Sequence, residues 1–160
     1  AAVVYSNLEA VQTQSYGSEA RGTAAKSEVI LSDNPIKYPK VIRADYSIFM
    51  SQKAFDTYID GAKSGSTLLI DPDLVSCDRD QEFRVIPVPA MRTADEIGAR
   101  MVSNMVMLGA FAEVSGVVTL DALEHAVRDI VPEHTLEVNT RGLHSGASII
   151  KRHHHEPEGV

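Results

Sequence analysis

The sequence predicts an α/β fold in which a mainly parallel sheet is flanked by helices. Short runs rich in β-branched residues alternate with longer segments of helical periodicity, and the links between them are short. The chain has 160 residues, 44% of them hydrophobic and 23% charged, which is long enough for one core and short for two. We therefore expect one domain over residues 1–150 and a polar, disordered tail over residues 151–160.

The first quarter of the chain should contain two strands. Residues 1–4 are typical of the end of a helix, and residues 8–14 alternate as a half-buried strand does. Residues 24–32 are expected to form a second strand, which ends at Asp33-Asn34-Pro35 because proline lacks a backbone donor and restricts its predecessor.

The middle of the chain alternates strand, helix and strand. A strand over residues 46–50 leads into a helix that Ser51 caps and Gly61 ends. Further strands are expected over residues 67–70 and 85–88, and two prolines push the second of these to a sheet edge. The predicted buried side of the helix consists of Ala54, Phe55, Tyr58 and Ile59.

The longest helix is predicted from Thr93 to Val114. Thr93 and Glu96 have capping-box spacing, and Met101 continues an amphipathic first half. Residues 102–112 are apolar nearly all round, so this part must be covered on every side, by the core or by another subunit. The residues that we expect at an interface are Asn104, Met105 and Met107.

Two helices should complete the chain. Thr119 caps the first, whose apolar face consists of Leu120, Leu123, Ala126, Val127 and Ile130. The second passes through Leu136, Leu143, Ala147 and Ile150. Gly142 and Gly146 lie four residues apart on it, a spacing that allows close helix contact and more often serves ordinary packing than a dimer face.

The composition excludes several classes of function. A net charge of −7 disfavours nucleic acid and anionic membranes as partners, and no apolar run is long enough to span a bilayer. The N-terminus lacks the pattern of a signal peptide, so a cytoplasmic location is expected. Cys77 is the only cysteine, which rules out an internal disulfide and a cysteine-held zinc or iron–sulfur site.

No arrangement for nucleophilic catalysis or metal binding can be identified in the sequence. The histidines are scattered, and the run His153 to His155 lies in the expected tail, where consecutive side chains cannot all point the same way. Asp71 and Asp73 are better suited to ending a strand than to acid–base catalysis. We therefore expect no catalytic residue and no metal site in this chain.

The candidate binding residues lie in a loop between the first two predicted strands. Gly17 and Gly22 allow sharp turns, and Glu19 and Arg21 present one charge of each sign between them. Such a loop can be a recognition loop, or a tight turn whose charges merely face water. The residues alone leave both interpretations open.

Three sequence blocks resemble a known family. Ser15-Tyr16-Gly17-Ser18-Glu19-Ala20-Arg21-Gly22, Ser32-Asp33-Asn34-Pro35-Ile36 and Asn104-Met105-Val106-Met107-Leu108-Gly109-Ala110 resemble, in the same order, motifs of the gamma subunit of 2-oxoacid:ferredoxin oxidoreductases. The likeness is greatest to the 2-oxoglutarate type. The sequence departs from the pattern of this family in two places. A glycine-rich strand–helix unit expected at the start is missing, and Thr23 stands where the family has a second glycine.

The resemblance implies a Rossmann-like domain that is part of a larger enzyme and inactive alone. Such enzymes convert a 2-oxoacid to an acyl-coenzyme A and reduce ferredoxin. Thiamine diphosphate, magnesium and iron–sulfur clusters would lie in the alpha, beta and possibly delta subunits, which would also contact ferredoxin, and coenzyme A would be a co-substrate. The residues that it places beside coenzyme A or a subunit interface are Tyr16, Gly17, Glu19, Arg21 and Gly22. The alternative is a stand-alone binding module for coenzyme A or another nucleotide-like ligand.

Overall fold

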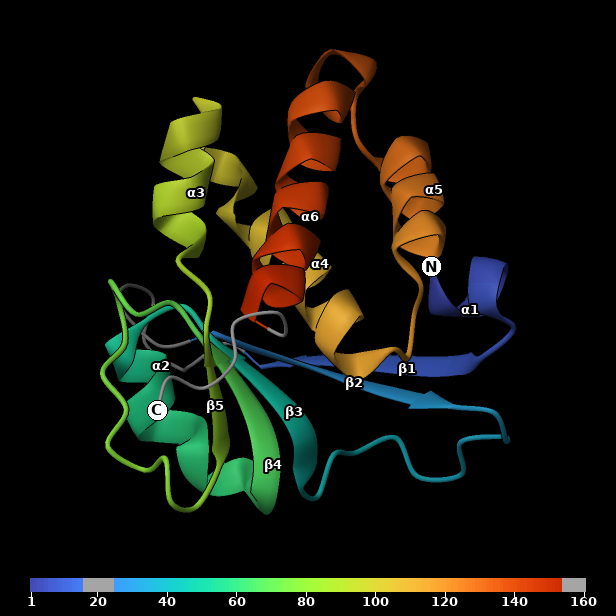
Figure 1. Ribbon diagram of the computed structural model, residues 1–160. Helices are drawn as coiled ribbons and strands as arrows, with labels where there is room; N and C mark the ends of the chain where they lie inside the picture. Colours follow the sequence, from blue (N-terminus) through green and yellow to red (C-terminus); the bar gives the residue numbers. More distant parts are fainter. Residues whose placement is uncertain (16–24, 154–160) are drawn as a thin grey trace. The chain divides into compact units, whose positions relative to one another are not determined.

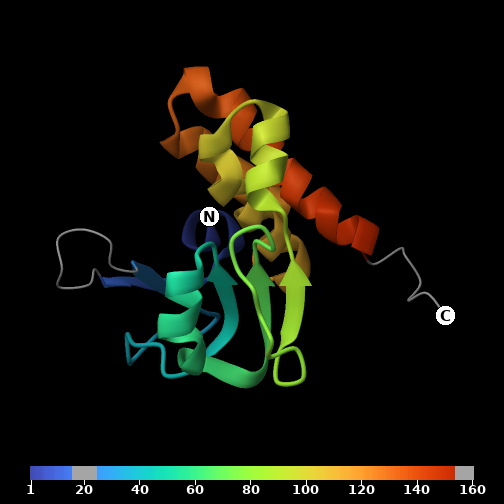
Figure 2. The ribbon, with the colours of Figure 1, turned by 90° about the vertical axis from the view of Figure 1, so that its left-hand side faces the viewer.

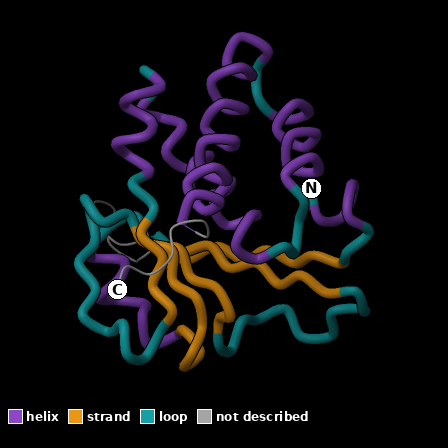
Figure 3. Tube along the Cα trace, in the orientation of Figure 1, coloured by secondary structure: helices purple, strands orange, loops and turns teal. Residues whose placement is uncertain are grey.

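The computed structural model describes residues 1–15 and 25–153 (Figure 1). Contacts divide the chain into two compact units, one over residues 2–87 and one that runs from Val88 onward and includes Ala1. All the described strands lie in the first unit, and the described part of the second unit is built of helices (Figure 3). The single domain predicted over residues 1–150 stays a prediction.

The first unit opens with a short helix and an antiparallel pair of strands. Each residue from Glu9 to Ser15 pairs with one from Ser32 back to Lys26. The sequence predicted both strands to within two residues at each end, but it did not predict their antiparallel pairing. These elements are α1 (Ala2–Ser6), β1 (Glu9–Ser15) and β2 (Lys26–Ser32).

A three-stranded parallel sheet forms the second part of this unit, and Figure 2 shows its three arrows pointing the same way. The strands are β3 (Ala44–Phe49), β4 (Ala62–Ile70) and β5 (Arg84–Pro87), in the order β3-β4-β5. β5 is therefore an edge strand, as its prolines predicted. β4 begins five residues before the predicted start at Thr67, because the polar residues 63–66 belong to an irregularity of the β3–β4 ladder that the pattern does not reveal.

The connection from β3 to β4 is α2 (Gln52–Tyr58), which a 3-10 turn, η1 (Ile59–Gly61), continues. The Ser51 hydroxyl accepts a hydrogen bond from the Ala54 N–H at 3.2 Å, so the predicted cap is confirmed. Phe55 packs edge-on against Phe49 of β3, with ring centroids 5.2 Å apart. The buried core around this pair consists of Phe49, Phe55, Ile59, Ala62, Leu68, Ile70, Val75 and Phe83.

The second unit contains a break between two helices that the residue pattern does not reveal. The single helix predicted from Thr93 to Val114 is wrong: Gly98, with φ of +81°, ends one helix, and the next begins at Ser103. The Ala99 N–H donates to the Ala94 carbonyl at 3.0 Å, which is the bond that closes a helix when a glycine takes the left-handed conformation. Met101, predicted to face inward, is 76% exposed in the linking turn.

The helices of the second unit otherwise agree with the predicted order. They are α3 (Ala90–Ile97), the 3-10 turn η2 (Arg100–Val102), α4 (Ser103–Ser115), α5 (Leu120–Ile130) and α6 (Glu133–His153). Thr119 caps α5 as predicted, since its hydroxyl accepts from the Ala122 N–H at 3.1 Å. Ile130, placed by the pattern on the buried face of α5, is 79% exposed at the end of that helix.

Helices α4 and α6 cross with their main chains in contact. A Cβ atom added at Gly109 would overlap the Leu143 carbonyl, and one added at Gly146 would overlap the Val106 carbonyl. At Gly142 an added Cβ would lie 3.2 Å from the Met105 Cβ atom. The glycine spacing noted in the sequence thus serves packing within the chain. The α/β class and the parallel sheet with helices are confirmed.

Candidate functional site

The residues predicted to bind a ligand are Tyr16, Gly17, Glu19, Arg21 and Gly22, and all of them lie outside the described residues. The structure does describe the two strands that this segment joins. Ser15 at the end of β1 pairs with Lys26 at the start of β2, so the segment between them closes an antiparallel hairpin. Its two ends are therefore held at adjacent positions of one ladder.

Side chains fix the base of this hairpin. The Lys26 Nζ atom lies 2.9 Å from Glu28 Oε1 and 5.3 Å from the centroid of the Tyr58 ring on α2. Thr13 Oγ1 donates to Glu28 Oε2 at 3.5 Å across the ladder. Because Tyr58 packs against the core of the first unit, Lys26 connects the hairpin to that core through a cation–π contact.

The residues predicted at an interface lie at the start of α4, in the second unit. Asn104 is exposed, and its Oδ1 atom accepts a hydrogen bond from the Met105 N–H at 2.9 Å. Met105 is half-buried, whereas Met107 is 2% exposed. Of the three, Asn104 and Met105 retain surface that another subunit can contact, and the interface itself stays a prediction.

A charged hollow of about 440 Å³ lies beside the amino-terminal ends of β3, β4 and β5. Arg79 Nη1 lies 3.1 Å from Asp60 Oδ1, and its Nη2 atom lies 2.6 Å from Glu82 Oε2. The hydrogen bond to Glu82 and, to a smaller extent, the one to Asp60 raise the pKa of the Arg79 guanidinium. The residue pattern gives no sign of this cluster, because only the spacing of Arg79 and Glu82 is local and Asp60 lies in a different segment.

The cations of this hollow have partners within the chain. Arg43 donates to the Asp60 carbonyl, and Lys63 Nζ lies 3.0 Å from Asp45 Oδ1. A smaller hollow of about 220 Å³ adjoins it, and Ser66 is one of the residues that line it. Ligands of parallel sheets usually bind at the carboxyl ends of the strands. The charged hollow lies at the opposite, amino-terminal ends. The cluster is therefore best explained as a link between the turn that holds Asp60 and the loop before β5.

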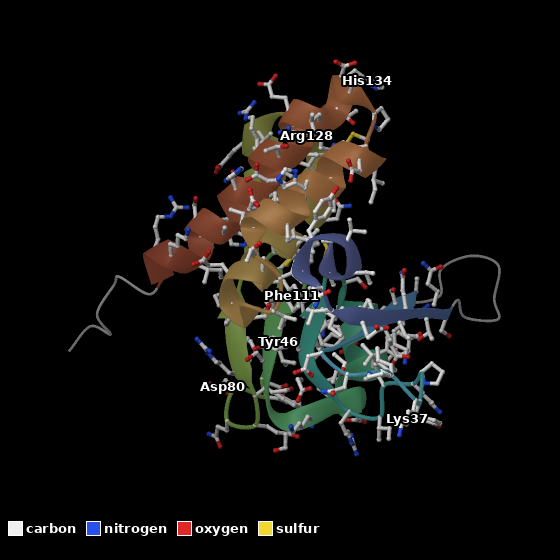
Figure 4. All side chains as sticks on the ribbon, turned by 90° about the vertical axis from the view of Figure 1, so that its right-hand side faces the viewer. Lys37, Tyr46, Asp80, Phe111, Arg128 and His134 are labelled. Carbon is white, nitrogen blue, oxygen red and sulfur yellow. The ribbon has the colours of Figure 1, made fainter. Side chains whose placement is uncertain are left out.

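The remaining predicted residues have structural roles or lie on the surface. Asp71 is fully buried after β4, and its Oδ1 atom accepts from the Asp73 N–H at 3.1 Å, which confirms that the pair ends a strand. Cys77 is half-buried against the core. Figure 4 shows His134 at the beginning of α6 and Asp80 in the loop before β5. His144 Nε2 lies 2.6 Å from Glu124 Oε1 on α5.

Within residues 1–15 and 25–153, no three histidine, cysteine or carboxylate side chains gather as metal ligands would. Among the same residues, no helix combines the length and the apolar character needed to cross a membrane. The histidines His154 and His155 lie outside the described residues.

Comparisons with known proteins agree on one family. The family described as pyruvate ferredoxin/flavodoxin oxidoreductase matches residues 1–149. The chain is 46% identical to the 2-oxoglutarate synthase subunit KorC of Methanocaldococcus jannaschii, over 94% of this chain and 82% of that protein. It also resembles the keto/oxoacid ferredoxin oxidoreductase gamma subunit of Geobacter sulfurreducens, with a TM-score of 0.81 and 35% identity over 94% of this chain and 85% of that one.

A third likeness concerns the fold alone. The 2-oxoglutarate:ferredoxin oxidoreductase of Magnetococcus marinus matches with a TM-score of 0.81 at 22% identity. The match covers 91% of this chain but 26% of that one. The same arrangement of elements thus occurs as one part of a much longer chain.

Proposed function

The chain belongs to the pyruvate ferredoxin/flavodoxin oxidoreductase family, and from this premise we propose that it is the gamma subunit of a multi-subunit 2-oxoacid:ferredoxin oxidoreductase. The observation that carries the proposal is the identity to a 2-oxoglutarate synthase subunit along nearly the whole chain. It also favours 2-oxoglutarate as the substrate. The enzyme would convert that acid to succinyl-coenzyme A and reduce ferredoxin.

In this proposal the chain supplies binding surfaces, and the alpha, beta and possibly delta subunits hold the reactive groups. One cysteine cannot bind an iron–sulfur cluster, since such clusters usually take four cysteine ligands. We assign thiamine diphosphate, magnesium and the clusters to those subunits, where they would supply decarboxylation and electron transfer. Contact with ferredoxin would also pass through the partners. A cytoplasmic location stays a prediction from the sequence.

Within this chain, the segment from Tyr16 to Gly22 is the part that we assign to coenzyme A or to the subunit surface beside it. Arg21 is suited to a phosphate because a guanidinium can donate two parallel hydrogen bonds. The hairpin ladder supports the assignment, since it holds both ends of the segment and is linked to the core through Lys26 and Tyr58. Asn104 and Met105 would contact a partner subunit from the start of α4.

Co-expression with the alpha and beta subunits tests the proposal. The assembled enzyme should reduce ferredoxin when 2-oxoglutarate and coenzyme A are both present, and the chain alone should not. Arg21→Ala should lower kcat/KM for coenzyme A by about 10- to 100-fold, as expected for one charge-assisted hydrogen bond. Arg128→Ala, a change on the surface of α5 (Figure 4), is the matched control and should leave turnover unchanged.

Two results would count against this assignment. A chain that binds coenzyme A tightly but never joins the other subunits would be the stand-alone binding module instead. An assembled Arg21→Ala enzyme with unchanged dependence on coenzyme A would show that the segment only closes the hairpin.

A further inference from the structure

The connections that follow β3 and β4 are joined by hydrogen bonds at the carboxyl ends of these strands, which the arrowheads mark in Figure 2. The Ser76 N–H donates to Gln52 Oε1 at 2.8 Å, and Gln52 Nε2 donates back to the Ser76 carbonyl at 3.4 Å. Gln52 begins α2, which follows β3, whereas Ser76 lies in the connection after β4. One side-chain amide thus bridges two connections that lie 24 residues apart in the chain.

Further contacts hold both sides of this bridge. Gln52 Nε2 also donates to Asp56 Oδ1 at 2.8 Å, one helical turn further along α2, which orients the amide. The Asp71 N–H donates to the Phe49 carbonyl at 3.2 Å, so the ends of β3 and β4 are tied together as well. Because Asp71 is fully buried, the connection after β4 starts from a fixed point.

We call residues 50–53 and 71–76 the carboxyl edge. Most of it is exposed, and Asp71 and Val75 anchor it in the interior of the unit at 0% and 3% exposure. Exposed connections usually remain mobile, because ordering them costs conformational entropy. Ligands of open parallel sheets lie outside the carboxyl ends of the strands, and a binding site needs surrounding hydrogen bonds that hold its loops. The carboxyl edge meets both conditions.

We propose that the carboxyl edge faces coenzyme A in the assembled oxidoreductase, and that Gln52 is a positioning residue that holds this edge in the conformation coenzyme A requires. This inference rests on the proposed function, which assigns coenzyme A to this chain as its small-molecule contact. Pro72 and Leu74 are exposed on the edge and offer apolar surface to the methyl groups of the pantetheine arm. Gln52 would act through these residues.

The amino-terminal ends of the same sheet provide the comparison. There Arg79 also links two connections, through ion pairs to Asp60 at 3.1 Å and to Glu82 at 2.6 Å. Ligands of parallel sheets do not usually lie at this end. If bridges between connections served stability alone, loss of either bridge should have the same consequence. The inference predicts that only loss of the bridge at the carboxyl edge affects coenzyme A.

Steady-state kinetics of the assembled enzyme test this difference. Gln52→Ala removes both bonds to Ser76 and should lower kcat/KM for coenzyme A by about 10-fold, because a displaced loop weakens substrate positioning. The value for 2-oxoglutarate should stay unchanged. Asp56→Ala removes only the bond that orients the amide, so it should have a smaller effect in the same direction.

Arg79→Ala is the matched control at the amino-terminal ends, and it should leave kcat/KM for both substrates unchanged. Thermal unfolding should show that all three variants retain the fold, since Gln52 and Asp56 are exposed and Arg79 is half-buried. If Gln52→Ala does not assemble, Asp56→Ala decides the question by the same measurement.

The outcomes separate this inference from the proposed function. If the wild-type chain forms no active complex, or if that complex does not need coenzyme A, the proposed function fails. If Gln52→Ala assembles and keeps the wild-type kcat/KM for coenzyme A, the inference is wrong and the proposed function stands. Equal losses in Gln52→Ala and Arg79→Ala, or equal losses for the two substrates, would also overturn the inference, because the bridge would then serve the fold alone.

Discussion

In the first unit the elements pack through large side chains, whereas in the second unit two helices meet through their main chains. Phe49, Phe55 and Leu68 fill the space between the parallel sheet and its helix. At the crossing of α4 and α6 the space is closed by Gly109 and Gly146. The first kind of contact loses stability when atoms are removed, and the second when atoms are added.

The largest effect should come from one added methyl group at the helix crossing. In Gly146→Ala the new Cβ atom overlaps the main-chain carbonyl of Val106, which cannot move away without displacing a helix. We expect the free energy of unfolding to fall by at least about 4 kcal/mol, well beyond the average point mutation. Urea denaturation followed by circular dichroism measures this change.

Gly142→Ala is the matched control on the same helix. There the added atom meets the Met105 Cβ atom, the Val102 Cγ2 atom and the Val102 carbonyl oxygen, each at 3.2 Å, so a shift of a few tenths of an ångström relieves the crowding, whereas the added atom at Gly146 lies 1.9 Å from a carbonyl oxygen. The gain of about 1 kcal/mol in helix propensity then offsets the crowding. Equal stability of the two variants would show that the helices do not approach as closely as described.

A somewhat smaller effect is expected from removing atoms in the first unit. Leu68 is fully buried in β4, so Leu68→Ala should lower the free energy of unfolding by about 3 kcal/mol through lost burial and a cavity. The same denaturation experiment measures it. Val85→Ala, at a half-buried position of the neighbouring edge strand, should cost less, and the reverse order would contradict the description of the core.

The smallest loss of stability is expected from removing a helix cap, and it should be equal in the two units. Ser51 and Thr119 each cap a helix with one hydrogen bond, at 3.2 and 3.1 Å. Ser51→Ala and Thr119→Ala should each lower the free energy of unfolding by about 1 kcal/mol, because one backbone N–H loses its partner. Ser51→Asp and Thr119→Asp should keep most of this stability, because an aspartate can also cap a helix. If an alanine variant is as stable as the wild type, its helix does not begin where described.

Two helix caps set by neighbouring residues were predicted from the sequence, whereas the helix end at Gly98 and the contacts between distant residues were not. The caps at Ser51 and Thr119 depend on a residue three positions away, so a pattern shows them. Gly98 was missed because the apolar pattern continues across it, and only the closing bond from Ala99 to Ala94 shows that the helix stops.

The candidate site shows the same division. The segment around Arg21 was recognised from its residue types and its family resemblance, both of which can be read locally. The contact between Lys26 and Tyr58, which connects two elements, depends on tertiary packing that no short pattern encodes. For the same reason, the hydrogen bond from Gln12 to Ser27 across the hairpin became apparent only when the register of the two strands was known.

The glycine contacts also limit how the second unit can change shape. A slide of α6 along α4 by one helical turn, about 5.4 Å, would carry Val138 or Ile150 into a place now held by a glycine. Either side chain would collide with the main chain or the side chains of the neighbouring helix. The pair is thus locked against sliding, and any motion of this unit during an enzyme's working cycle must carry both helices together.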